Sequence, residues 1–228
     1  MKYLRVFGLA ILAGVMIALG GLAYVACCAY ETTGIGKIIG SILFATGLLS
    51  VCAFGLFLYT GRIGYAFEKK ADYLLALLIG YIGNIIGACG IGYICFATAP
   101  FTDGKMGGVV ANIANSRDIL AGGETWYSAL LLGVLCGVLV FVGVDLFKRK
   151  PGVIGTLALI FAVATFVVGG TEHCIANMFY FSAANHWNGG TVIDILLVTL
   201  GNSIGSLAFW GLLKLGGLIV KQPEAASK

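Results

Sequence analysis

The amino-acid sequence predicts an all-α integral membrane protein with six transmembrane helices, arranged as two inverted three-helix repeats in which the second and fifth helices are broken. Three observations support this fold class. Hydrophobic residues make up 60% of the 228 residues and charged residues only 11%, a balance that a soluble domain of this size does not need. Six apolar segments each reach about 20 residues or more, the length that a bilayer core requires. A short glycine–asparagine motif occurs in both halves of the chain.

The first three apolar segments make up the N-terminal half. The first runs from about 7 to 29, behind the charged start Met1–Arg5. It is longer than the apolar region of a signal peptide, which has about 7 to 15 residues, so we expect an uncleaved first span. The second segment runs from about 35 to 67 and the third from about 73 to 99.

The C-terminal half follows a polar connection, about 100 to 124, that is rich in Gly, Asn and Asp. The fourth segment spans about 126 to 147, the fifth about 152 to 181 and the sixth about 192 to 220. A short polar tail, 221 to 228, ends the sequence. The chain therefore divides into two sets of three spans.

The second and fifth segments are too long for simple spans. Each would be about 45 Å long as a helix of about 30 residues, whereas the hydrocarbon core is about 30 Å thick. Each also contains a polar interruption, Tyr59–Arg62 in the second and Gly169–His173 in the fifth. Irregular backbone at this depth is tolerated only where it is buried or lines a cavity. We therefore expect both helices to be broken beside a path through the protein.

The fifth segment carries Glu172, His173 and Asn177 inside an otherwise apolar stretch. An ionisable residue at membrane depth costs about 2.5 to 3.5 kcal/mol, so such residues usually face a bundle interior or a water-filled path. These residues favour a role in transport over a buried pair that only joins helices. His173 is the more informative of the two ionisable residues, because an imidazole changes its protonation near neutral pH.

A five-residue GNxIG motif occurs at 83–87 in the third segment and at 201–205 in the sixth. Because each half has three spans, an odd number, the two halves must have opposite orientations. Inverted repeats with paired broken helices are typical of transporters and channels, with the path at the repeat interface. We expect Asn84 and Asn202, inside these motifs, to satisfy backbone groups that the breaks leave free.

The repeats define the domain organisation. We interpret the chain as a single transmembrane domain over residues 1–228. Its parts are repeat one (about 1–99), the connection (about 100–124), repeat two (about 125–220) and the tail (221–228).

Lysine and arginine positions predict a multi-pass protein of the cell membrane with both termini in the cytoplasm. If the N-terminus is inside, eleven basic residues fall inside and three outside, which is the positive-inside bias. The inside set is Lys2, Arg5, Arg62, Lys69, Lys70, Lys148, Arg149, Lys150, Lys214, Lys221 and Lys228, and the outside set is Lys37, Lys105 and Arg117.

Over nearly its whole length, the chain resembles the formate/nitrite transporter family. The resemblance rests on the six spans, both GNxIG motifs, the broken second and fifth segments, and the family's EHxxANM string, which Glu172–Met178 matches. It implies a homopentamer in the lipid bilayer with one pore per subunit, through which small monovalent anions such as formate, nitrite or hydrosulfide pass. It also implies an aquaporin-like hourglass pore.

The pore residues of the family carry over to positions in this chain. The central histidine matches His173, and the loop threonine of the broken second helix matches Thr60. Phe166 lies seven residues before His173, so on helical spacing both face one lumen. The residues that match the apolar constrictions are Phe44, Leu48 and Leu58 on one side and Phe166 on the other.

The resemblance also implies a mechanism in which protonation aids anion passage. Carrying a bare charge through an apolar constriction is costly. Formate, nitrite and hydrosulfide are each the base of a weak acid, so a proton makes each of them neutral. We expect Thr60 to donate a hydrogen bond to the anion, and His173, when protonated, to attract the anion and pass it a proton. Glu172 is expected to orient or charge-balance the imidazole, or to bond backbone freed by the break.

One departure from the family bears on the substrate. The loop Leu58–Arg62 reads LYTGR, where many relatives have Phe before the Thr and Asn or Ser after it. The Thr–Gly–basic pattern and the short ends of the chain favour the hydrosulfide-conducting branch of the family, and formate and nitrite stay open.

Other functional classes fit the sequence less well. A channel for neutral solutes such as water or glycerol is the alternative, but the paired NPA motif of that class is missing. An enzyme or redox protein would need a set of ligands, whereas the only histidines are His173 and His186 and the seven cysteines form no CxxC pair. We therefore expect no enzymatic activity, no metal and no cofactor. The sequence has no basic patch with interleaved aromatic residues, so we expect no nucleic-acid partner.

Overall fold

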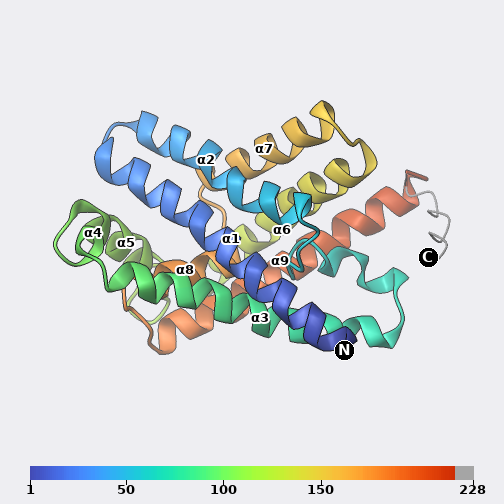
Figure 1. The fold of residues 1–228 in the computed structure, drawn as a ribbon, viewed down its shortest axis with the longest axis horizontal. Coiled ribbons are helices and arrows are strands. Elements are labelled where there is room, and N and C mark those ends of the chain that lie inside the picture. Colours follow the sequence, from blue (N-terminus) through green and yellow to red (C-terminus); the bar gives the residue numbers. More distant parts are fainter. Residues whose placement is uncertain (219–228) are drawn as a thin grey trace.

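The structure is a computed structural model that describes residues 1–218, and it is built from helices joined by short connections (Figure 1). The end of the sixth predicted segment, at 220, and the predicted tail, 221–228, lie outside the described residues. The elements are α1 (Lys2–Tyr30), α2 (Gly34–Ala53), the 3₁₀ helix η1 (Ile63–Glu68), α3 (Ala71–Phe96), α4 (Ala99–Thr102), α5 (Lys105–Ser116), α6 (Trp126–Arg149), α7 (Val153–Val168), α8 (Cys174–Ala183) and α9 (Gly189–Leu215).

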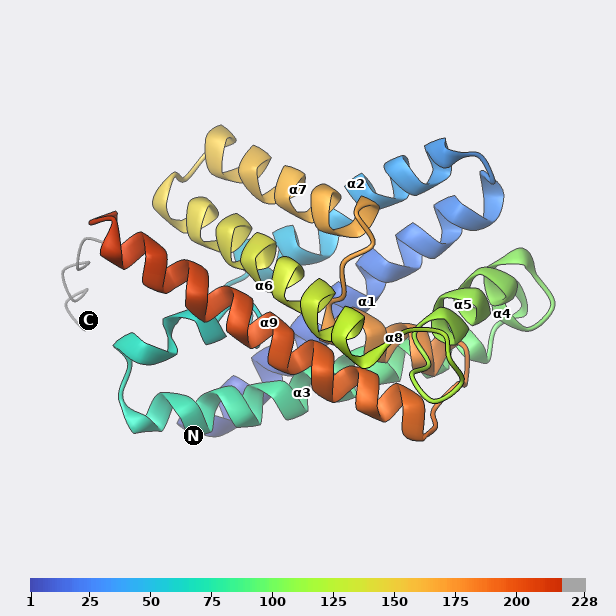
Figure 2. The ribbon, with the colours of Figure 1, turned by 180° about the vertical axis from the view of Figure 1, so that it is seen from behind.

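Two sets of three long elements form the body of the protein. In the N-terminal set, α1 packs along both α2 and α3, and in the C-terminal set α6 packs along both α7 and α9. The two sets are joined by contacts between α2 and α7, and by contacts of α3 with α8, the short helix between α7 and α9. Figure 2 shows α6 beside α9, and α7 next to α2.

Glycines let the long helices approach backbone to backbone. A Cβ atom added at Gly14 on α1 would lie 2.3 Å from the carbonyl oxygen of Asn84 on α3. A Cβ atom at Gly137 on α6 would lie 2.2 Å from the carbonyl oxygen of Asn202 on α9. Any side chain at either position would collide with the backbone of the neighbouring helix, so the high glycine content has a packing function.

The outer surface of the bundle suits a lipid environment. Five helices, α1, α2, α3, α6 and α9, are long and apolar enough to cross a membrane, and α7 and α8 are shorter apolar helices. Leu131, Leu135 and Leu196 each expose more than half of their surface on these helices. Large apolar side chains on the outside of long apolar helices are typical of a multi-pass membrane protein.

The second predicted segment, about 35 to 67, contains one long helix and not two long helices on either side of a break. α2 ends at Ala53, and Gly55 with a φ of +66° terminates it in the left-handed region that favours glycine. Residues 54–62 are irregular, and only the six-residue η1 follows. The break therefore begins before the predicted polar interruption at Tyr59–Arg62. The apolar side chains of Leu56 and Phe57 concealed it, because irregular backbone that is buried stays apolar in sequence.

The fifth predicted segment is interrupted at 169–173, the place where the sequence predicts a break. α7 ends at Val168, Gly170 has a φ of +70°, and α8 begins at Cys174. His173 is the N-cap of α8, in extended conformation. The polar residues of this segment thus lie on the break itself.

The connection predicted at 100–124 contains regular structure that the sequence analysis missed. The helices α4 and α5 occupy most of it, and α5 packs against α1 and α8. Val110 and Ala114, four residues apart, form the buried face of α5. The helix was missed because this apolar face is narrow and the Gly, Asn and Lys residues around it read as a loop.

Glycine packing between α6 and α9 generates a prediction. Gly137→Ala is expected to lower the stability by about 1 to 3 kcal/mol, because the new methyl group has only backbone to displace. Gly90→Ala is the matched control, since a Cβ atom at Gly90 on α3 meets nothing within 4 Å. The apparent melting temperature of each variant in detergent checks this, and equal values for the two variants would contradict the packing role.

Candidate functional site

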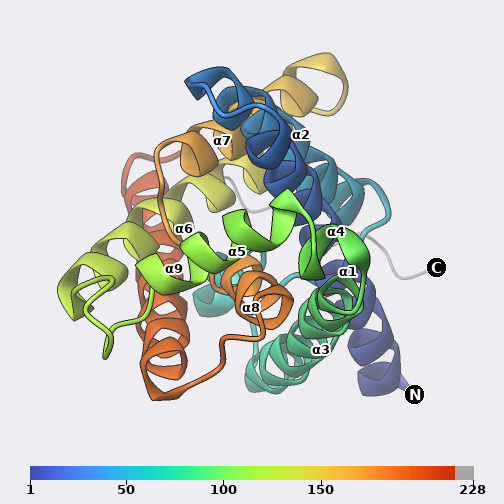
Figure 3. The same ribbon diagram turned by 90° about the vertical axis from the view of Figure 1, so that its left-hand side faces the viewer.

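A cavity of about 530 Å³ opens beside the C-terminal end of α5 and leads into the protein toward the break before α8. We call it the vestibule. Figure 3 shows α5 lying across this end of the bundle next to α8. The residues of the vestibule wall that matter below are Lys37, Phe44, Arg117, Phe166, Glu172 and His173.

Three buried rings meet at the inner end of the vestibule. Phe44 on α2 and Phe166 on α7 have ring centroids 5.8 Å apart in an edge-to-face arrangement. Phe166 stacks on His173 with centroids 5.9 Å apart and an angle of 19° between the ring planes. Each of the three side chains is at most 3% exposed. The rings therefore form an apolar floor with one polar edge.

The reason predicted for the pairing of Phe166 and His173 was wrong. The two residues do not share a helix face, because α7 ends at Val168 and residues 169–173 are not helical. The irregular backbone, with Gly170 in the left-handed region, carries His173 back against the phenyl ring. Contact between the rings depends on the break and not on the 3.6-residue period.

Thr60 and His173 form a buried hydrogen-bonded pair from the two halves of the chain. Thr60 Oγ1 lies 2.9 Å from His173 Nε2, and the Thr60 side chain is fully buried. Thr60 comes from the irregular segment 54–62, and His173 comes from the α7–α8 connection. Both helix breaks therefore contribute one polar side chain to the same point.

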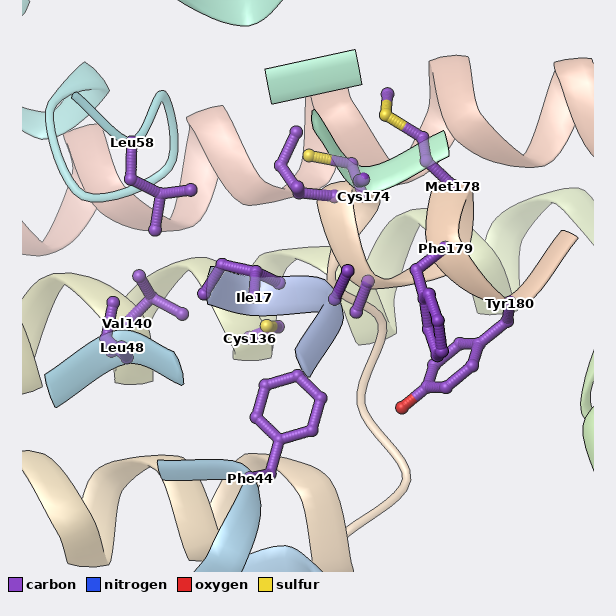
Figure 4. Packing of buried hydrophobic residues seen from close by; sticks show 14 of the residues in the cluster. Ile17, Phe44, Leu48, Leu58, Cys136, Val140, Cys174, Met178, Phe179 and Tyr180 are labelled. Atoms are coloured by element: carbon purple, nitrogen blue, oxygen red, sulfur yellow. The ribbon is translucent and has the colours of Figure 1, made fainter. Parts of the chain in front are cut away.

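Two buried leucines from the first half of the chain accompany this pair. Leu48 on α2 and Leu58 on the 54–62 segment are each 1% exposed. Figure 4 shows Leu58 pointing from its segment toward the region where Leu48 and Val140 lie, with Phe44 set apart from them. Leu48 follows Phe44 by four residues, so both share one face of α2.

The hydrogen bonds of His173 define the form of its ring. Nδ1 accepts a hydrogen bond of 3.2 Å from the backbone N–H of Ala176, which caps the N-terminus of α8. Nδ1 is therefore unprotonated, and in the neutral ring the proton is on Nε2. With this assignment Nε2–H donates to Thr60 Oγ1, and the hydroxyl proton of Thr60 is left to donate to another group.

Glu172 has neither of the two roles expected for it, because within residues 1–218 its carboxylate bonds neither His173 nor a backbone group. Its carboxylate accepts hydrogen bonds from Arg117 Nε at 2.8 Å and from Asn177 Nδ2 at 2.6 Å. Arg117 Nη1 in turn donates to Asn177 Oδ1 at 2.9 Å. The imidazole is oriented by the Ala176 N–H and by Thr60 instead. The Glu172 side chain faces the guanidinium because an ion pair offsets the burial of its charge.

Arg117 is the functional candidate that sequence reasoning missed. It appeared there only as one of three outside basic residues. In the structure its guanidinium lines the vestibule, packs over the Tyr180 ring at 5.1 Å and is held by Glu172 and Asn177. The available signal was a lone arginine directly after the narrow apolar face of α5.

The segment that carries Arg117 is tied to the α8–α9 connection by its neighbour. Asp118 Oδ2 accepts hydrogen bonds from Asn188 Nδ2 at 2.6 Å and lies 2.9 Å from His186 Nε2, and its Oδ1 accepts from the N–H of Ala121. Burial by itself raises the pKa of Asp118, but the hydrogen bonds from Asn188, Ala121 and His186 outweigh it and hold the pKa below its ordinary value. Asp118 thus stays ionised and fixes the position of Arg117.

Asn84 and Asn202 make equivalent contacts at the two breaks. Asn84 Oδ1 accepts from the N–H of Tyr59, and its Nδ2 donates to the carbonyl oxygens of Ala10 and Phe57. Both amides are fully buried. Each side chain satisfies three backbone groups and so fixes the backbone next to Thr60 or His173. The contacts of Asn202 are with Cys174 N–H, Gly133 O and Glu172 O.

Comparisons with known proteins agree on one family. A family model described as formate/nitrite transporter matches residues 1–216. A probable formate transporter of Methanothermobacter thermautotrophicus is 28% identical, over 90% of this chain and 85% of that protein. The formate channel FocA of Escherichia coli K12 is 26% identical, over 91% of this chain and 86% of that protein.

Solved structures have the same fold. A pentameric formate channel with formate bound superposes with a TM-score of 0.81 at 24% identity, covering 95% of this chain and 98% of that one. An ion channel of the FNT family gives a TM-score of 0.82 at 20% identity, over 94% of this chain and 90% of that one. These structures share the helical arrangement described above.

The bracing of the second break generates a prediction. Asn202→Ala leaves one N–H and two carbonyl groups without their partner in a buried place, so we expect a loss of stability of about 3 kcal/mol or more. Thermal unfolding in detergent measures this. Asn112→Ala, at an exposed position on α5, is the matched control and should unfold as the wild type does. Equal stability of the two variants would show that the backbone at the break has other partners.

Proposed function

We propose that this chain, which belongs to the formate/nitrite transporter family, is an anion channel whose pore passes Thr60 and His173 and whose substrates are small monovalent bases of weak acids. The observation that carries the proposal is the buried hydrogen bond of 2.9 Å between Thr60 Oγ1 and His173 Nε2, at the inner end of a cavity lined by Arg117. Formate is the first substrate to test, because the relatives cited above are named as formate transporters or channels.

The first step of the proposed path is attraction into the vestibule. Arg117 and Lys37 line this cavity and supply positive charge at its surface. An arginine that is held by Glu172 and Asn177 keeps its guanidinium in a fixed place, so an anion meets a formed site. Glu124 and Glu172 line the same cavity, so the attraction is local: the N–H groups of the fixed guanidinium can donate to an anion, which favours anions over neutral solutes such as water or glycerol.

The second step is passage through the apolar neck. Phe44 and Phe166 contact each other and both line the vestibule, so Phe44 is not grouped with Leu48 and Leu58 opposite Phe166, as the resemblance led us to expect. We place Leu48 and Leu58, both buried, beyond this pair of rings. A bare charge loses its hydration there and gains few polar partners, which is costly. Thr60 supplies the hydrogen bond that the anion needs, because its oxygen already accepts from His173 and its proton is free.

The third step is neutralisation of the anion by a proton from His173. When His173 takes up a second proton, that proton is on Nδ1. The charged ring therefore loses the hydrogen bond from the Ala176 N–H, and this bond can form again once Nδ1 has lost its proton. In the net transfer the Nε2–H bond of the imidazolium, on the Thr60 side, breaks and an O–H bond of the acid forms (an S–H bond for hydrosulfide). Water takes the remaining proton from Nδ1 and returns one to Nε2, which restores the resting ring. The neutral acid then crosses the apolar neck without the cost of a charge.

Architecture and assembly follow the same reasoning. We propose two inverted three-helix repeats around an hourglass pore, supported by the matched contacts of Asn84 and Asn202 at the two breaks. We propose a homopentamer with one pore per subunit, since the formate channel that superposes on this chain is described as pentameric. The distribution of basic residues supports a cytoplasmic location for both termini in the cell membrane.

Uptake into liposomes tests the proposed function directly. Protein reconstituted in liposomes should take up formate faster than protein-free liposomes, and nitrite and hydrosulfide measured side by side define the selectivity. Preferred hydrosulfide uptake would assign the chain to the hydrosulfide-conducting branch. Uptake of none of the three anions would contradict the proposal.

Thr60→Val generates the first prediction for the pore. The variant keeps the shape of the side chain and removes the hydroxyl, and hydrogen bonds to charged groups contribute about 1.5 to 3 kcal/mol. We expect the maximal rate of formate uptake to fall about tenfold or more, by the same reasoning. Thr46→Val on the exposed face of α2 is the matched control and should keep the wild-type rate. An unaltered rate for Thr60→Val would remove Thr60 from the path.

His173→Asn generates the second prediction. Asparagine is a good N-cap residue, so α8 should form as before, but a carboxamide does not pass on a proton. Proton transfer by a positioned side chain contributes about 100-fold or more, and we expect the maximal rate of formate uptake to fall by that order. Circular dichroism and gel filtration of the purified variant confirm that it folds. A folded variant with wild-type uptake would exclude His173 as the proton donor.

A further inference from the structure

Asp194 is a buried acidic residue that the proposed path does not use. It lies on α9 and is fully buried. Its Oδ2 accepts one hydrogen bond of 2.9 Å from Asn177 Nδ2, and its Oδ1 has no hydrogen-bond partner among residues 1–218. Buried carboxylates are normally paired with a cation or with several donors. Asp194 therefore differs from the other buried acids described above.

The surroundings of Asp194 contain more acid than base. Asn177 Nδ2 also donates to Glu172 Oε2 at 2.6 Å, so one amide group serves two carboxyl groups. Arg117 is the cation of this cluster, and its Nε is bonded to Glu172. The groups that face Asp194 from the neighbouring segments are Glu172 before α8, Cys174 on α8, and Arg117 and Glu124 in the α5–α6 region.

The number of charges in this cluster depends on one proton. If Asp194 holds a proton, the Arg117–Glu172 ion pair is neutral and nothing buried next to it carries a free charge. If Asp194 loses its proton, a second carboxylate charge stands behind Arg117 with one amide donor and no cation of its own. A buried charge without a partner is far more costly than a neutral carboxyl group in the same place.

We propose that Asp194 is a proton-binding site linked to anion binding at Arg117 in the vestibule, an inference that rests on the proposed function. Arg117 lines the vestibule and donates hydrogen bonds to Glu172 and Asn177. Asn177 in turn donates to both Glu172 and Asp194, so it connects Asp194 with the Arg117–Glu172 pair. An ionised Asp194 lowers the potential at Arg117 and repels the incoming anion. A protonated Asp194 removes that repulsion, so that the guanidinium of Arg117 can donate hydrogen bonds to the anion.

The link works in both directions. Protonation of Asp194 raises the affinity of the vestibule for the anion, and the bound anion raises the affinity of Asp194 for its proton by the same factor. The proton that accompanies the anion at this site is held separately from the Thr60–His173 pair. Asp194 therefore acts on how tightly the vestibule binds, whereas Thr60 and His173 act on the rate of crossing.

The half-saturating formate concentration for uptake into liposomes tests this, measured from mildly acid to mildly alkaline pH. Formic acid, like other carboxylic acids, is ionised above about pH 5, so its own titration does not set the profile. For the wild type we expect this concentration to rise about fivefold or more as the pH rises, the low end of typical couplings between sites. Asp194→Asn has the same shape and no charge, and should keep the low value at every pH.

Asp103→Asn is the matched control, because it removes the same charge from an exposed position between α4 and α5. Its profile should follow the wild type. An Asp194→Asn variant that keeps the wild-type profile overturns the proposal while leaving the pore intact. An Asp194→Asn variant with high half-saturating values at all pH values also overturns it, since the charge would then be required. Wild-type liposomes without formate uptake contradict the proposed function itself and this inference with it.

Proton uptake on formate binding gives a second readout that does not depend on the variant folding. Formate is added to the purified wild-type protein in weakly buffered detergent solution near neutral pH, and an indicator dye reports the change in proton concentration. We expect the wild type to take up protons and Asp194→Asn, where it folds, to take up fewer. No proton uptake by a wild type that transports formate overturns the proposal.

Discussion

The structure depends on one constraint, which is that backbone groups freed by a helix break inside a membrane must find partners within the protein. Each unsatisfied group at that depth costs several kcal/mol. Asn84 and Asn202 meet this need at the two breaks, with three backbone bonds each. Glycines bring α1 close to α3 and α6 close to α9, and across these contacts the two side chains also reach the carbonyl groups of Ala10 and Gly133. The glycines, the asparagines and the irregular segments thus form one unit.

That unit positions the two polar side chains of the proposed pore. Thr60 and His173 are 113 residues apart and still lie within hydrogen-bond distance, because each follows directly on backbone that an asparagine holds. The irregular segments serve function as well as folding. A continuous helix would point Thr60 or His173 in a direction set by its period, whereas a braced break sets that direction freely. The same break gives α8 its N-cap, so the orientation of the His173 ring is part of the helix end.

Much of this arrangement could be predicted from the sequence. The five long apolar helices followed from segment length and hydropathy, and the break at 169–173 followed from an apolar segment too long for the bilayer and from polar residues inside it. Three features could not be predicted. The break after α2 lies in buried apolar residues such as Leu56 and Phe57, so it leaves no polar trace. The helix α5 has too narrow an apolar face to stand out. The partner of Glu172 is Arg117, 55 residues away, and no local pattern predicts a contact that only tertiary packing creates.

The residues that we propose to line the pore come from both halves of the chain, which has a consequence for its synthesis. Phe44, Leu48, Leu58 and Thr60 belong to the first half, whereas Phe166 and His173 belong to the second. A chain that has left the ribosome only as far as α3 holds one wall of the neck and none of the residues that face it. On the proposed path, the facing wall arrives with α7 and α8, and the backbone at the second break gains its partner only afterwards, when α9 brings Asn202. A partly made subunit therefore has no complete path through which the membrane potential would be lost.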